Sequence, residues 1–218
     1  MYTLDNISVY ILNWKKVSNN SLILYDKIYP IIENTCIINC DESLIIKDNI
    51  PHIQLDDSHY YGSQYNHSIK HVKDDNILCV IVGDNIPNNN FSEIFQCALK
   101  TFNSINVGVY APHDKRSVHQ TKLKNISENL YNVSTKDCGF WFIHPKIVKK
   151  LKNIDYNICK YGWGIDVITA KEAVKQKFLV VRDYSIETDQ LDHTQGYDAV
   201  KAKDDWAKLE NIYKSSFF

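Results

Sequence analysis

Two carboxylates stand directly after apolar runs that are typical of β-strands. Asp41 follows the run at residues 35–39, and Asp84 follows the run at residues 77–82. In an open parallel sheet, ligands bind beyond the carboxyl ends of the strands, so both side chains are candidates for a binding site. Asp41 is suited to accept hydrogen bonds from a base or a ribose. The alternative is a surface turn in which Asp41 and Ser43 act as helix caps.

Asp84 is preceded by Gly83, which permits a close approach between the backbone and a ligand. One carboxylate in such a place is suited to a hard divalent cation, because Mg²⁺ commonly takes one or two protein carboxylates together with substrate phosphates. The alternative is that Asp84 caps a helix that begins near Phe91. Because a central apolar strand would direct Asp84 into the crevice, we favour the binding function.

The densest glycine cluster of the chain is Gly162-Trp163-Gly164, and it lies just before Asp166. The chain has only 7 glycines in 218 residues, about 3% against an average of about 7%, so a cluster is informative. Two glycines around a tryptophan predict a turn with an exposed aromatic face. Such a face beside a carboxylate can hold a sugar ring and deprotonate a hydroxyl. A structural Trp163 with a capping Asp166 is the alternative.

The composition excludes several classes of protein. Neither of the glycine-rich phosphate-binding patterns, GxGxxG or GxxxxGK[ST], occurs. The 25 basic and 26 acidic residues nearly balance, which argues against duplex nucleic acid as a partner. The six cysteines lie mostly in apolar runs and are expected to be buried thiols. With no long apolar window and no signal-peptide pattern at the start, we expect a soluble, cytoplasmic protein without a membrane span.

Short apolar runs alternate with helix-like stretches, which predicts βαβ units around a mostly parallel central sheet flanked by helices. We expect strands at residues 7–12, 35–39, 52–55, 77–82, 107–110, 140–143 and 178–181. We expect helices from residue 18 or 19 to 32, through 65–72, and at 91–102, 145–151, 165–175 and 201–213. The polar residues 111–135 are predicted to be a mobile loop that leads into a weaker strand. With 44% hydrophobic residues, residues 1–218 are expected to form a single α/β domain.

Taken in order, these features resemble the family 2 type of GT-A glycosyltransferase, and the resemblance covers nearly the whole chain. The family motifs in question are an acidic Asp-Asp-Gly-Ser turn, a Gly-x-x-x-x-Asn helix start, the metal-binding Asp-x-Asp, a Gly-Gly-Phe strand, a Gly-Trp-Gly-x-Asp segment and a late histidine. The first strand ends with Ile11-Leu12-Asn13, and the segments that resemble the six motifs in order are Asp41-Glu42-Ser43, Gly62-Ser63-Gln64-Tyr65-Asn66, Gly83-Asp84-Asn85, Asp137-Cys138-Gly139-Phe140-Trp141, Gly162-Trp163-Gly164-Ile165-Asp166 and His193.

The resemblance implies a Rossmann-like nucleotide-diphospho-sugar transferase domain, with a nucleotide-binding half at about residues 1–110 and an acceptor-binding half at about 111–218. It implies roles for single residues as follows: nucleotide binding by Asn13, Asp41, Asn66 and Asp84; a divalent cation, Mn²⁺ or Mg²⁺, on Asp84 and His193; sugar or acceptor binding by Trp141, Trp163, Gly139 and Gly164; and general-base catalysis by Asp166. Lys115 and Arg116, in the polar loop, either clamp a diphosphate on closure or are simply solvated.

The activity implied is that of a hexosyltransferase, which moves one sugar with inversion from a nucleotide-diphosphate sugar, most commonly a UDP-sugar, to a hydroxyl. The acceptor is left open among a glycan, a protein, a small molecule and a modified base. The Gln-x-x-Arg-Trp motif of processive members is absent, so we expect transfer of a single sugar. Two departures leave details open: Asp84 is the only acid of its motif, and Ile165 stands where many members have Glu.

Two other functions remain open at this point. A nucleotidyltransferase would share the nucleotide-binding sheet, but it usually carries a glycine-rich loop with Arg and Lys after the first strand. In this chain that place reads Asn13-Trp14-Lys15-Lys16, without glycine. A non-catalytic module that binds nucleotide sugars would explain the weakened metal motif by a loss of activity.

Overall fold

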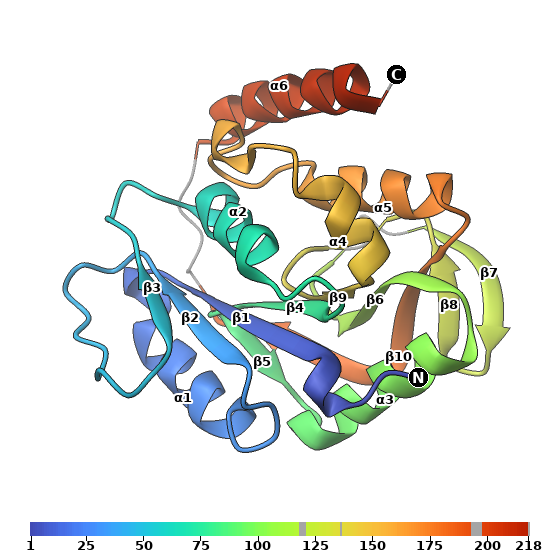
Figure 1. Ribbon diagram of the computed structural model, residues 1–218, viewed down its shortest axis with the longest axis horizontal. Coiled ribbons are helices and arrows are strands. Elements are labelled where there is room, and N and C mark those ends of the chain that lie inside the picture. Colours follow the sequence, from blue (N-terminus) through green and yellow to red (C-terminus); the bar gives the residue numbers. More distant parts are fainter. Residues whose placement is uncertain (118–120, 136, 193–197, 218) are drawn as a thin grey trace.

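The computed structural model describes residues 1–117, 121–135, 137–192 and 198–217, and these residues form an α/β structure (Figure 1). In chain order, its main helices and strands are β1 (Ile7–Asn13), α1 (Ser18–Ile28), β2 (Thr35–Asn39), β3 (His52–Gln54), α2 (Tyr61–His71), β4 (Ile77–Val82), β5 (Asn85–Pro87), α3 (Phe91–Ser104), β6 (Val107–Asp114), β7 (Lys122–Ser127), β8 (Leu130–Val133), β9 (Phe140–Ile143), α4 (Pro145–Leu151), α5 (Ile165–Lys175), β10 (Leu179–Gln190) and α6 (Ala199–Phe217).

The described strands form one sheet with the order β3-β2-β1-β4-β9-β6-β10-β8-β7, and β5 pairs with β10 outside this path. The pairs β3–β2, β2–β1, β1–β4 and β6–β10 are parallel, whereas β9 runs antiparallel to both of its neighbours. The hairpin β7–β8 and strand β5 add further antiparallel pairs. The expectation of a mostly parallel sheet is therefore wrong, and the sheet is mixed. Its apolar strands are buried on both faces, so their residue pattern carries no information about direction.

Helices cover both faces of the sheet (Figure 1). Helices α1 and α3 pack on one face, where Leu24 and Ile94 belong to one apolar cluster. Helices α2, α4 and α5 pack on the other face, where Tyr65 and Ile168 belong to a second cluster. Helix α6 lies outside α5 and contacts it. The six residues of β4 are all buried, as expected for a central strand covered on both faces.

Residues 111–135 differ from the predicted loop. Strand β6 continues to Asp114, and residues 122–133 form the hairpin β7–β8, which pairs with β10. All six residues of β7 are exposed or half-buried, because this strand lies at the edge of the sheet. An edge strand with a solvated surface lacks the apolar signal by which a buried strand is recognised. Polarity therefore indicated a loop where the chain forms a hairpin.

Strand β10 is also longer than expected. It runs to Gln190: it pairs with β6 along most of its length, with two shifts in register, with β8 at residues 181–183 and with β5 at residues 188–190. In the part of the chain that the structure describes, no helix combines the length and apolar character needed to cross a membrane.

Candidate functional site

The carboxyl ends of five strands meet at one edge of the sheet. Strands β1, β2 and β4 are mutually parallel, and β6 and β10 are parallel to each other. Both β4 and β6 run antiparallel to β9, so all five strands point the same way. Ligands bind at this edge in open α/β sheets. The polar residues at or just beyond these strand ends are Asn13, Asn39, Asp41, Asp84, Asp114 and Gln190.

Asp41 is buried at 4% exposure and is held by hydroxyls from two elements. Ser18 Oγ, at the start of α1, donates to Asp41 Oδ2 at 2.7 Å, and Ser43 Oγ donates to Oδ1 at 2.5 Å. The Ser43 backbone N–H also donates to Oδ1, at 3.0 Å. Burial by itself raises the pKa of Asp41, but the hydrogen bonds from Ser43 and Ser18, with the nearby charge of Lys15, outweigh it and lower the pKa. Asp41 is therefore an anion that can only accept hydrogen bonds.

A polar network fixes the backbone behind Asp41. Asn13 Nδ2 donates to Asn39 Oδ1 at 2.6 Å, and Asn39 Nδ2 donates to the backbone oxygen of Asp41 at 2.9 Å. Gln64, from α2, donates to the backbone oxygen of Asn13 at 2.7 Å. Asn13 and Asn39 are fully buried. The structure thus brings Asn13 and Asp41 together, with Asn13 as a support behind the carboxylate.

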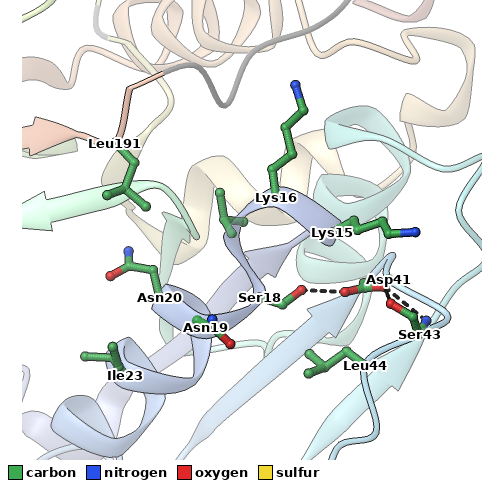
Figure 2. Close-up of a pocket in the computed structure, with 11 residues that line it drawn as sticks. Lys15, Lys16, Ser18, Asn19, Asn20, Ile23, Asp41, Ser43, Leu44 and Leu191 are labelled. Atoms are coloured by element: carbon green, nitrogen blue, oxygen red, sulfur yellow. Dashed lines mark hydrogen bonds between the residues drawn. The ribbon is translucent and has the colours of Figure 1, made fainter.

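A cavity of about 550 Å³ opens beside Asp41 (Figure 2). Its walls come from the turn between β1 and α1, from α1 itself, from the turn after β2 and from Leu191. Lys15 and Lys16 line it, and the charge of Lys15 acts on the anionic Asp41, whereas the Lys16 side chain extends away from Asp41 (Figure 2). A cavity with a fixed carboxylate and ammonium groups can bind a group that carries N–H donors at one end and phosphate oxygens at the other.

The turn Gly83-Asp84-Asn85 continues the edge of this cavity. Asn20, which lines the cavity, donates to the backbone oxygens of Gly83 at 2.7 Å and Asn85 at 3.1 Å. Leu191, which also lines it, donates its backbone N–H to the Asp84 oxygen at 2.8 Å. Asp84 is buried at 5% exposure. A Cβ at Gly83 would lie 2.2 Å from Ser21 Oγ, so only glycine lets this turn pack against α1.

Asp166 lies in the first turn of α5 and has a different electrostatic environment from Asp41. Burial, together with the negative charge of Asp137, raises the pKa of Asp166 to about 6. Hydrogen bonds from the Val167 backbone and from Thr135 oppose this rise only partly, and the Thr135 Oγ1 contact is long, at 3.4 Å. A carboxylate with a pKa near 6 is mostly ionised at neutral pH yet accepts a proton readily. Both properties suit a general base.

The turn before α5 requires its two glycines. Gly162 and Gly164 have φ angles of +81° and +83°, a left-handed backbone conformation that favours glycine. A Cβ at Gly164 would lie 2.2 Å from the Trp206 ring of α6, and one at Gly162 would lie 2.3 Å from the Tyr61 ring. Trp163 between them is half-buried. The glycine cluster therefore shapes the junction of α2, α5 and α6 as well as positioning Trp163 and Asp166.

Other predicted site residues lie in the packed interior. Trp141 has no exposed surface and stacks on Tyr65, with 5.7 Å between the ring centroids, so its ring offers no face to a sugar in this structure. Asn66 accepts a hydrogen bond from the Tyr156 backbone at 3.2 Å and joins α2 to the 3₁₀ turn Tyr156–Ile158. Gly139 is buried but borders polar groups.

The two predicted clamp residues are ion-paired on the surface. Lys115 Nζ lies 2.9 Å from Glu187, and Arg116 lies 2.8 Å from Asp189 and 3.0 Å from Asp192. All five side chains are at least two-fifths exposed, so these pairs can exchange partners at little cost in stability.

His193 lies outside the described residues. Among the residues that are described, no group of three or more His, Cys, Asp and Glu side chains is arranged to hold a metal ion. Asp84 supplies one buried carboxylate. Its oxygens fit a Mg²⁺ or Mn²⁺ ion whose remaining ligands come from phosphates and water.

Sequence reasoning did not select Ser18, Asn39, Asn85 or Gln190 for the site. Ser18 was considered only as a helix cap, and Gln190 lies in a part of β10 that was not expected to be a strand. Asn39 ends a predicted strand, and it pairs with Asn13 in the register of β1 and β2. The matching place of the two asparagines at the ends of their apolar runs was the signal that could have identified Asn39 as a site residue.

No protein-family model and no curated protein sequence matches this chain. Solved structures do resemble it. GalNAc-T7 with UDP, GalNAc and Mn²⁺ aligns with a TM-score of 0.65 at 8% identity over 96% of this chain and 49% of that one. Mannosyltransferase PcManGT from Pyrobaculum calidifontis, in complex with GDP-Man and Mn²⁺, aligns with a TM-score of 0.60 at 10% identity over 96% and 63%. A UDP-glucose pyrophosphorylase complexed with UDP-glucose aligns with a TM-score of 0.53 at 7% identity over 96% and 99%.

These likenesses show the fold. The chain has the Rossmann-like α/β architecture that the aligned glycosyltransferases and the pyrophosphorylase share, which confirms the predicted fold class apart from strand direction. It spans about half the length of GalNAc-T7 and less than two thirds of the mannosyltransferase.

Proposed function

We propose that this protein is a non-processive glycosyltransferase that moves one sugar from a nucleotide-diphosphate sugar to a hydroxyl acceptor with inversion. The observation that carries the proposal is the division of roles between two acids at one end of the sheet. Asp41 is held as an anion beside a cavity, and Asp166 is poised to take up a proton. Environments that shift the pKa values of two acids in opposite directions give them different roles, here binding for Asp41 and catalysis for Asp166.

The cavity beside Asp41 would hold the nucleotide. Its carboxylate oxygens accept hydrogen bonds, so it suits bases that present N–H groups, such as uracil and guanine. Lys15 and Lys16 would attract the diphosphate. Solved structures of the same fold hold UDP and GDP-Man, which supports a nucleoside diphosphate in this cavity; we expect UDP.

Asp84 would hold a divalent cation, and the resemblance adds His193 as a ligand. When bound, the cation neutralises negative charge that builds up on the departing diphosphate. Mn²⁺ in the two glycosyltransferase structures supports this assignment. Trp163, Gly139 and Gly164 would border the sugar and the acceptor, and Lys115 and Arg116 would exchange their surface partners for phosphate oxygens.

The chemical step requires one proton transfer and one displacement. The acceptor hydroxyl gives its proton to Asp166, and its oxygen forms a bond to the anomeric carbon from the face opposite the leaving group. The bond from that carbon to the diphosphate oxygen breaks, and the electron pair leaves with the diphosphate. Because attack comes from the opposite face, the configuration of the sugar inverts. Asp166 lowers the barrier because the proton moves as the oxygen attacks.

The substitution Asp166→Asn tests the catalytic assignment. It keeps the shape and removes the proton-accepting charge, so turnover of a nucleotide sugar should fall by about 10²- to 10⁴-fold, the usual contribution of a general base. Binding of the nucleoside diphosphate, measured by calorimetry, should stay within a factor of two. Asp48→Asn, at an exposed position, is the matched control. Turnover at the wild-type rate in the Asp166 variant would remove the base assignment.

A nucleotidyltransferase is the second candidate, because the aligned pyrophosphorylase covers 96% of this chain and 99% of its own length. The two activities release different products. Incubation with UTP and a sugar 1-phosphate would release pyrophosphate from a nucleotidyltransferase, whereas a UDP-sugar would release UDP from a glycosyltransferase. A non-catalytic binding module would bind the nucleotide sugar in calorimetry and release neither product.

A further inference from the structure

The side chain of Asn85 lowers the stability of the folded protein, because its polar atoms are buried without hydrogen-bond partners in the described structure. Asn85 is 1% exposed, and within the described structure neither its Nδ2 nor its Oδ1 finds a hydrogen-bond partner. A buried polar group without a partner costs about 1–3 kcal/mol, and an apolar residue of similar size would not carry that cost. The amide of Asn85 therefore does not serve the stability of the fold.

The backbone of Asn85 is firmly placed. Asn85 opens β5 and pairs with Gln190 at the end of β10. Its backbone oxygen accepts a hydrogen bond from Asn20 at 3.1 Å. Gln190 is itself fixed, because its Nε2 donates to Asp114 Oδ2 at 2.8 Å. The carboxamide is thus held at a defined position by its neighbours while its own hydrogen-bonding atoms are unused.

Gly139 borders this carboxamide. A Cβ at Gly139 would lie 3.0 Å from Asn85 Nδ2, 3.5 Å from Gln190 Nε2 and 3.8 Å from Asp137 Oδ1. Three polar side chains, each from a different segment, therefore surround Gly139, which precedes β9 and has no side chain of its own. We call Asn85, Gly139, Gln190 and Asp137 the polar niche.

The polar niche connects the two ends of the candidate site. Asn85 adjoins Asp84 and the turn that borders the nucleotide cavity. At its other side, Asp137 is near enough to Asp166 to affect its ionisation. In the proposed reaction, the transferred sugar must lie between the leaving diphosphate and the general base. The polar niche lies between the turn at Asp84 and the general base Asp166, where that sugar would be.

We propose that the Asn85 carboxamide, backed by Gln190, recognises a hydroxyl of the transferred sugar. A sugar hydroxyl both donates and accepts a hydrogen bond, and a carboxamide offers one group of each kind. A site whose polar atoms are buried discriminates strongly against a ligand that leaves them unpaired. Gly139 keeps the space over the carboxamide free of a side chain. This inference rests on the proposed function and adds a residue that selects the donor sugar.

The test compares binding of UDP-glucose, GDP-mannose and the corresponding free nucleoside diphosphates in the presence of Mn²⁺, by calorimetry, for wild type and Asn85→Leu. The wild type should bind one nucleotide sugar more tightly than its diphosphate. In Asn85→Leu the affinity for that nucleotide sugar should fall about tenfold or more, and the affinity for the diphosphate should change less than twofold. The thermal stability of the unliganded variant should be equal to or higher than that of the wild type. Asn49→Leu, at an exposed position, is the matched control.

Each outcome decides between explanations. An equal loss for the sugar and the diphosphate would show that Asn85 holds the phosphates or the cation, and it would overturn the inference while leaving the proposed function intact. An unchanged preference for the nucleotide sugar would overturn it in the same way. A wild type that binds no nucleotide would overturn both. If Asn85→Leu does not fold, Gly139→Ala replaces it, because its Cβ presses on the carboxamide and should likewise remove the preference for the sugar.

Discussion

At the scale of single residues, the site contrasts the buried carboxylate of Asp41 with the half-buried carboxylate of Asp166. Asp41 receives hydrogen bonds from Ser18 and Ser43, so its ionised form is favoured. Burial and the nearby charge of Asp137 outweigh the hydrogen bonds from the Val167 backbone and Thr135, and they raise the pKa of Asp166 to about 6. These opposite shifts make opposite predictions for the pH dependence of stability.

Removal of the Asp166 charge should stabilise the protein at neutral and alkaline pH. Burial and the charge of Asp137 hold the folded pKa at about 6, above the value of about 3.9 in an unfolded chain. Ionisation therefore lowers stability progressively as the pH rises from about 4 through 6. Asp166→Asn should melt a few degrees higher than wild type at pH 8, and the difference should vanish near pH 4. A difference that is the same at both pH values would contradict the assigned pKa.

Replacement of Asp41 should have the opposite effect. Hydrogen bonds depress the folded pKa, so Asp41 contributes stability above its unfolded pKa, and this contribution is lost as the pH falls through the folded pKa. Asp41→Asn should lower the free energy of unfolding at pH 7 by about 1–3 kcal/mol, the usual worth of hydrogen bonds to a charged group. Urea unfolding measures the difference. Asp48→Asn should have no effect, and equal stability of both variants would show that the Asp41 network is dispensable.

At the scale of the elements, sequence patterns predicted the buried strands and missed the hairpin at one edge of the sheet. The apolar runs of β1, β2, β4 and β9 and the helices between them were located correctly. The expectation of a mostly parallel sheet was wrong: β9 is antiparallel to both of its neighbours, and a run buried on both faces reads the same in either direction. The hairpin β7–β8 was missed because its exposed residues carry no apolar signal, although the two-residue connection at 128–129 is typical of a hairpin.

The candidate site shows the same limit. Asp41 and Asp84 were predicted from their place after apolar runs, and the structure puts both at the expected edge of the sheet. The burial of Trp141 and the packing role of Asn66 depend on contacts with α2 and with residue 156, which no local pattern contains. Their binding roles stay predictions.

Gly164 lies where the turn before α5 contacts α6, so a substitution there tests this packing. Gly164→Ala would combine a left-handed φ of +83° with a Cβ 2.2 Å from the Trp206 ring. The backbone strain alone costs about 1–3 kcal/mol, so the free energy of unfolding should fall by at least that amount. The double variant Gly164→Ala, Trp206→Ala should lose less than the sum of the two single changes, because the clash is gone. Strict additivity in urea unfolding would mean that α6 does not pack on this turn.

At the scale of the whole molecule, the two halves of the chain share one sheet. Strand β9, from the second half, lies between β4 and β6 and hydrogen-bonds to both. Strand β10 pairs with β6 and also with β5, the short strand that begins with Asn85. The cavity beside Asp41 shows the same mixing, since Leu191 completes a wall that is otherwise built from residues 15–44. The sheet therefore joins the two halves of the chain physically.

This interleaving predicts that residues 1–110 do not fold alone. Without β9, strand β4 would expose an edge of four paired positions, Leu78 to Ile81, that are fully buried in the whole protein. Unpaired backbone groups and uncovered apolar side chains at such an edge favour aggregation. The fragment should show no cooperative thermal transition by circular dichroism. As a control, the full chain nicked between Lys47 and Asp48, in an exposed connection, should still melt cooperatively. A cooperative transition in the fragment would instead show that the nucleotide-binding half is an independent domain, and the shared sheet would then be an assembly of two folding units.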